Sequence, residues 1–193
     1  MASAEQNPVT LHHHKLYNRT ILLARKIHGD VASLLESYVE KQGLDRTICL
    51  DSVDGVPSAA TQPEGEMTAA ERLGAGLQAY RAFQALLGEV LEEQRTHLTP
   101  LDTDFHASIH SVLLQVQALA RQLEELLGCD RLAWEAAGPP ALGGLSLFQM
   151  KLRGLKVLQE LAHWAVRTVR DLHQVATHSP GSGPARGCQV QAE

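Results

Sequence analysis

The sequence predicts an all-α fold: a long-chain four-helix bundle with up-up-down-down topology and two long crossover loops. Four stretches carry apolar residues at intervals of three and four, the period of a helix with one face on a core. The connections between these stretches are long, short and long in turn. With 193 residues, 44% of them hydrophobic, the chain can bury one substantial core. One domain is therefore expected over residues 11–178, between a flexible segment at 1–10 and a disordered tail at 179–193.

The first helix is expected to start at Thr10, which can cap it, and to end near Gln42, before Gly43. Its apolar positions follow the helical period: Leu16, Leu23, Ile27, Val31, Leu34 and Tyr38. From Gly43 to Glu66 this period is lost, and glycine and proline accumulate. A long connector is predicted there.

The second helix begins at a capping box, Thr68 with Glu71, and is expected to reach about Leu98. Its core stripe is Leu73, Leu77, Tyr80, Phe83, Leu87 and Leu91. Thr99 and Pro100 then mark a short turn.

The third helix is expected from about Asp102 to Leu127, and Gly128 ends it. Its inward positions are Phe105, Ile109, Val112, Val116, Leu119 and Leu123. A second long connector follows, rich in glycine and proline.

The fourth helix, Leu145 to His178, carries two rows of residues. One row is predicted to face the core: Leu155, Leu158, Ala162, Val166, Val169 and Ala176. The other lies on the opposite side and predicts a second surface away from the core: Arg153, Glu160, Trp164, Arg167 and Asp171.

Loop lengths decide the topology. A helix of about 30 residues is about 45 Å long. The first connector can extend roughly 80 Å and the second roughly 50 Å, so each can return along a whole helix. The short turn cannot. The first two helices therefore run parallel, the last two run parallel, and the second is antiparallel to the third, as in growth-hormone-type cytokine bundles.

Charge and composition exclude several classes of protein. The net charge is −5, from 17 basic and 22 acidic residues, which argues against nucleic-acid binding. No apolar run approaches the roughly 20 residues that span a bilayer, and the N-terminus has no apolar segment followed by a cleavage site. We therefore expect a cytoplasmic protein made without a signal peptide. Three cysteines, an odd number, argue against a framework of obligatory disulfides.

Several runs are similar to those of one known family: LARKIHGDVASLLESYVEKQGL, LDSVDGVP, DFHASIHSVLLQV and LFQMKLRGLKVLQELAHWAVRTVRDL. The chain resembles the ciliary neurotrophic factor family, of the leukaemia-inhibitory-factor type of long-chain cytokines, over about residues 10 to 178. The resemblance implies a neurotrophic cytokine with no enzymatic activity and no cofactor, which acts outside the cell after unconventional release. Its implied partners are the ciliary neurotrophic factor receptor alpha subunit, the leukaemia inhibitory factor receptor and the shared glycoprotein signal transducer, with Janus kinase and STAT signalling behind them.

The family's Phe-x-x-Lys motif falls on Phe148 and Lys151, at the start of the last helix. The resemblance implies that these two residues contact the leukaemia inhibitory factor receptor. On the residues alone, the pair fits equally well a hydrophobic staple at the end of the bundle.

The family's surface for the alpha subunit matches Arg25 in the first helix and Arg167 and Asp171 in the last. Trp164 shares the row of the latter two, and partial cover by a crossover loop is expected for it. Arg167 and Asp171, four apart, also fit a solvated ion pair. This sequence departs from the family in two ways: the family's basic residues later in both of these patches are His28 and His173 here, and the tryptophan of the family's first crossover is replaced near positions 62–64. The first and third helices are expected to present the transducer surface.

Two other functions remain open on the residues alone. Glu160 and His163 have the Glu-x-x-His spacing of metal-binding four-helix bundles, but no second such motif accompanies them. His106 and His110 are four apart, without the acidic residue of a zinc protease between them. An intracellular helical scaffold is the other alternative.

Overall fold

The computed structural model describes residues 8–45, 47–48, 50, 53, 55–61, 67–128 and 144–177. It contains four long helices: α1 (Pro8–Gln42), α2 (Ala69–Glu93), α3 (Thr103–Leu127) and α4 (Leu147–Thr177). A 3-10 turn, η1 (Ala59–Thr61), lies in the first connector, and a π-helical turn, η2 (Gln94–Leu98), extends α2. The cysteines and the predicted tail at 179–193 lie outside the described residues. The all-α fold is confirmed.

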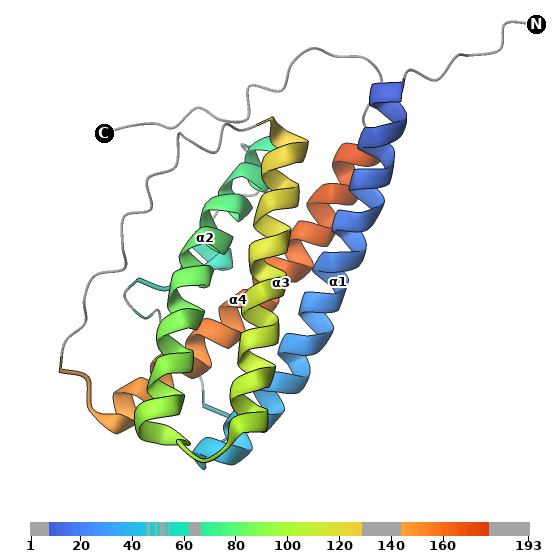
Figure 1. Cartoon of the computed structure of the whole chain (residues 1–193). Coiled ribbons are helices and arrows are strands. Elements are labelled where there is room, and N and C mark those ends of the chain that lie inside the picture. Colours follow the sequence, from blue (N-terminus) through green and yellow to red (C-terminus); the bar gives the residue numbers. More distant parts are fainter. Residues whose placement is uncertain are drawn as a thin grey trace, which may run out of the picture.

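Contacts between helices confirm the topology. α1 is antiparallel to α4, because Arg25 at the middle of α1 contacts His173 late in α4, while Tyr38 near the end of α1 contacts Lys151. Figure 1 shows α1 and α2 running one way and α3 and α4 running the other. The main packing partners are α1 with α3 and α4, and α2 with α3 and α4. The two parallel pairs therefore lie diagonally across the bundle.

The helix ends follow local rules. Thr68 and Glu71 form the expected capping box at the start of α2, and the Asp102 side chain accepts from the Phe105 amide at the start of α3. Gly43 and Gly128, each with φ of 65°, follow α1 and α3 in the left-handed conformation that glycine adopts without strain.

One core runs the length of the bundle. Every residue predicted inward on α2 and α3 is buried, and so are those of α1 except Leu23, which is partly buried. The largest fully buried side chains come from all four helices: Ile27, Tyr38, Leu73, Tyr80, Phe83, Leu87, Ile109, Leu119, Leu123, Leu155, Leu158 and Leu161. No helix within the described ranges is long and apolar enough to cross a membrane.

The prediction for α4 needs correction. Leu155 and Leu158 are buried, but Val166 is 53% exposed and Ala176 is exposed as well. α4 packs against α1, α2 and η1 at once, so its buried surface is wider than one stripe and is centred elsewhere. The polar row assigned to the opposite side is buried within it.

Candidate functional site

The middle of α4 binds the backbone of the first connector. The Trp164 indole N–H donates to the Pro57 carbonyl at 3.1 Å, and an Arg167 guanidinium N–H donates to the Ala59 carbonyl at 2.7 Å. The guanidinium also lies over the Trp164 ring, 5.5 Å from its centroid. Both side chains are buried, at 2% and 7% exposure. They therefore face a covering segment and not solvent.

Two residues one and two turns earlier continue this contact. The Glu160 carboxylate accepts from the Ala59 amide at 3.1 Å, and the Lys156 amine donates to the Leu50 carbonyl at 3.4 Å. Lys156 and Glu160 also form an ion pair at 2.9 Å. Ala59 is thus held on both its amide, by Glu160, and its carbonyl, by Arg167.

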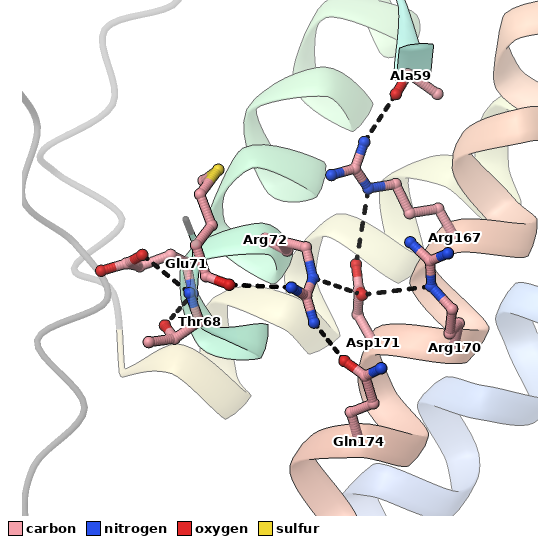
Figure 2. Close-up of polar contacts among 9 residues, drawn as sticks. Ala59, Thr68, Glu71, Arg72, Arg167, Arg170, Asp171 and Gln174 are labelled. Atoms are coloured by element: carbon pink, nitrogen blue, oxygen red, sulfur yellow. Dashed lines mark hydrogen bonds and ion pairs between the residues drawn. The ribbon is translucent and has the colours of Figure 1, made fainter. Parts of the chain in front are cut away.

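The other end of the connector is held by an ion pair between α2 and α4. The Arg72 guanidinium donates to the Asp171 carboxylate at 2.9 Å, to the Met67 carbonyl at 2.9 Å, and to Gln174. Asp171 is 2% exposed and lies 3.9 Å from the Arg167 Nε. Figure 2 shows Asp171 between Arg72 and Arg170, with Arg167 approaching it from above and reaching on to Ala59.

The prediction that this row of α4 forms a second, solvent-facing surface is therefore wrong. Trp164, Arg167 and Asp171 lie away from the centre of the core, as the spacing indicated, but the connector and α2 cover them. The structure also excludes a solvated ion pair between Arg167 and Asp171, because both are buried. Residue types could not predict this burial, because many of the groups that cover these side chains are main-chain carbonyls and amides, which any residue type supplies.

The start of α4 forms an exposed apolar corner. Phe148 is 60% exposed and so does not act as a buried staple. A capping box that the sequence analysis missed fixes this turn: Ser146 accepts from the Gln149 amide at 3.2 Å, and Gln149 accepts from the Ser146 amide at 2.9 Å. The Ser-x-x-Gln spacing was the available signal.

Lys151 lies beside this corner and touches the end of α1. Its amine donates to the Gln42 carbonyl at 3.2 Å, and its own carbonyl accepts from the Tyr38 hydroxyl at 2.7 Å. Tyr38 approaches closely because residue 154 is a glycine, where a Cβ would meet the tyrosine ring. The backbone around Lys151 is thereby fixed, while two of its three amine protons remain available to a partner.

Arg25 lies on the exposed face shared by α1 and α4. Its guanidinium donates to the His173 imidazole at 3.1 Å, so the structure brings together two positions that the sequence analysis placed on one surface. Leu22 and Val166 are exposed apolar residues on the same two helices.

The face of α1 and α3 carries a second exposed group. Asp30 accepts from Lys26 at 2.8 Å and from Gln115 of α3 at 2.8 Å. The hydrogen bond from Lys26, and next that from Gln115, lower the pKa of the Asp30 carboxyl below its ordinary value. Leu114 on α3 is half exposed.

The two histidine motifs that left a metal site open do not form one among the described residues. The Glu160 carboxylate pairs with Lys156 and accepts from the Ala59 amide. The Nδ1 atom of His163 lies 3.9 Å from that carboxylate, and the His163 ring is exposed. His106 is buried, while His110 is exposed. Among the described residues, no three histidine, cysteine, aspartate or glutamate side chains lie close enough to hold a metal ion.

Comparisons with known proteins agree over nearly the whole chain. The family model described as ciliary neurotrophic factor matches residues 1–191. Ciliary neurotrophic factor of Rattus norvegicus is 54% identical over 185 residues, which cover 94% of this chain and 92% of the rat protein. That of Oryctolagus cuniculus is 52% identical over 190 residues (97% and 95%), and that of Homo sapiens is 50% identical over 191 residues (97% and 95%).

Proposed function

The chain belongs to the ciliary neurotrophic factor family of four-helix cytokines, which are not enzymes, and on this premise we propose how it engages its receptors. It assembles a tripartite complex of the ciliary neurotrophic factor receptor alpha subunit, the leukaemia inhibitory factor receptor and the shared glycoprotein signal transducer. Assembly triggers Janus kinase and STAT signalling and promotes neuronal survival and differentiation. The protein acts outside the cell, on receptor chains at the cell surface.

The exposed corner at the start of α4 carries this proposal. Phe148 presents a ring that no other part of the described chain buries, and Lys151 supplies a cation one turn away. A large apolar ring next to a charge-assisted donor is the kind of small cluster that dominates the affinity of an interface. We assign this corner to the leukaemia inhibitory factor receptor.

The alpha subunit binds the face shared by α1, α4 and the first connector. Arg25 is its exposed residue on α1, next to His173 on α4. Trp164, Arg167 and Asp171 belong to the same region but are buried, the first two beneath the connector and Asp171 against Arg72 of α2, so the way they affect binding is taken up below. The replaced positions 62–64 of the connector lie outside the described residues.

The test adds purified protein to neuronal cells that respond to the rat relative. We expect STAT phosphorylation that disappears when any one of the three receptor chains is removed. The rat protein is the positive control, since it is 54% identical to this chain. A protein that leaves STAT unphosphorylated on cells where the rat protein acts would contradict the proposal.

A further inference from the structure

Four side chains of α4 form a line of contacts to the connector backbone. Lys156, Glu160, Trp164 and Arg167 are spaced by four, four and three, which places them on one helical face. Each hydrogen bonds a main-chain atom between residues 50 and 59, at distances of 2.7 to 3.4 Å. Their side chains are no more than 13% exposed. These four side chains therefore hold the connector against α4.

Asp171 extends the line to the far end of the connector. It pairs with Arg72, whose guanidinium also binds the Met67 carbonyl just before α2. It also approaches Arg167, which binds Ala59 (Figure 2). The connector backbone is thus held by one buried network at Ala59 and again at Met67.

From these contacts we infer that Trp164, Arg167, Asp171 and Glu160 are positioning residues for alpha-subunit binding: they hold the first connector in its binding position and do not touch the receptor. The inference rests on the proposed function and deepens it. A receptor that reached the Arg167 guanidinium would have to displace the connector first, and one that reached the Asp171 carboxylate would have to displace Arg72 of α2. Displacement would break several buried hydrogen bonds to charged groups, each of them costly to leave unpaired.

Glu160 distinguishes positioning from direct contact. It is 5% exposed, and its carboxylate accepts from the Ala59 amide. Glu160→Leu keeps the volume and removes the acceptor, whereas Glu160→Gln keeps an oxygen that can accept from the same amide. Both variants lose the charge that pairs with Lys156, so the comparison between them isolates the bond to Ala59. We expect the leucine variant to bind the alpha subunit at least about tenfold more weakly, the scale of one lost hydrogen bond to a charged group. The glutamine variant should stay within about threefold of the wild type.

Two further measurements accompany the binding assay. Amide hydrogen exchange at Ala59 should accelerate in the leucine variant and not in the glutamine variant, because that amide loses its partner only in the former. Affinity for the leukaemia inhibitory factor receptor should stay unchanged in both. Glu89→Ala is the matched control: it also removes a carboxylate that pairs with α4, through Arg153, but it touches no connector atom. It should leave alpha-subunit binding and Ala59 exchange as in the wild type.

The inference is overturned if Glu160→Leu binds the alpha subunit normally while Arg167→Ala does not, since the guanidinium would then be a direct contact. If the leucine variant melts early, Trp164→Phe decides, because it keeps an aromatic ring beside the Arg167 guanidinium but has no N–H to donate to the Pro57 carbonyl. Unchanged alpha-subunit affinity in Trp164→Phe would then refute positioning. Exchange at Ala59 is read without any receptor, so it tests the positioning network even if the wild-type protein bound no alpha subunit and the proposed function failed.

Discussion

Gly154 shows how a single residue admits a close contact between two helices. Glycine in a helix interior normally costs about 1 kcal/mol relative to alanine. Here a Cβ would lie 2.9 Å from Tyr38 Cζ and closer still to the hydroxyl. We expect Gly154→Ala to lower the free energy of unfolding by about 1–3 kcal/mol, because the rigid ring must move. Urea denaturation measures this.

Gly88→Ala is the control for that substitution. Gly88 lies inside α2, and nothing approaches an added Cβ within 4 Å. The same change should therefore raise stability by up to about 1 kcal/mol. Equal gains at both glycines would show that the contact of Tyr38 with Gly154 is looser than described.

Asp102 couples the start of α3 to the end of α1. The hydrogen bond from Lys41, and next that from the Phe105 amide, lower the pKa of the Asp102 carboxyl below its ordinary value of 3.8. A lowered pKa in the folded state means that the charged form stabilises the fold above that ordinary value. This stabilisation is lost as the pH falls through the lowered pKa.

Asp102→Asn tests this dependence. The amide oxygen can still accept from the Phe105 amide, but it carries no charge for Lys41. The wild type should be more stable than the variant at neutral pH, and the difference should shrink as the pH drops below about 4. Denaturation curves at several pH values measure it. A difference that grows in acid would contradict the prediction.

At the scale of elements, local pattern predicted α2 and α3 well and α4 poorly. α2 and α3 each have one broad buried face, so apolar spacing alone locates their core residues. α4 is covered on several sides, and part of that cover is a connector that contributes backbone atoms. The spacing of the polar residues on α4 therefore predicted an exposed surface where the structure has a buried one. At the corner of Phe148, the residues alone left a buried staple and an exposed contact equally open; the Ser146-x-x-Gln149 capping box that fixes this turn is a local signal that the sequence does contain.

The end of α2 also differs from the expected regular helix. Residues 94–98 form a π-helical turn in which the Thr99 amide bonds the Gln94 carbonyl at 2.9 Å. Pro100 disfavours helical conformation at Thr99, so the helix ends there with a wider turn. The Gln94 side chain is fully buried and accepts from Gln42 at 3.0 Å and from Thr99 at 2.8 Å.

Gln94→Leu should therefore destabilise the bundle end. It leaves the buried Gln42 amide without its acceptor and takes one partner from the partly buried Thr99 hydroxyl, which together cost about 1–3 kcal/mol. Gln78→Leu, the same change at an exposed position of α2, should stay within about 0.5 kcal/mol of the wild type. Adding Gln42→Leu to Gln94→Leu should cost less than the sum of the two, because both lose the same bond. Strictly additive effects would show that the bond contributes nothing.

At the scale of the whole molecule, the bundle separates the two proposed receptor surfaces. The corner of Phe148 and Lys151 lies at the start of α4, and His173 lies near its end beside Arg25. About 25 residues of helix separate them, which is roughly 37 Å. Two receptors can therefore bind one helix without competing for the same residues. The long second crossover makes α4 parallel to α3, and it thereby places the start of α4 at the end of the bundle where α1 ends.

The double variant Phe148→Ala with Lys151→Ala tests this separation. Because hot-spot residues each contribute about 2 kcal/mol or more, affinity for the leukaemia inhibitory factor receptor should fall by about a thousandfold. Affinity for the alpha subunit should not change, and the variant should then act as an antagonist. The fold should survive, since Phe148 is exposed and the Lys151 carbonyl can still accept from Tyr38.

Leu22→Ala is the control: it removes an exposed apolar side chain from α1, far from the corner, and should leave leukaemia inhibitory factor receptor affinity intact. Full affinity of the double variant for that receptor, or a joint loss of both affinities with the melting temperature, would show that the corner serves the fold and not the receptor.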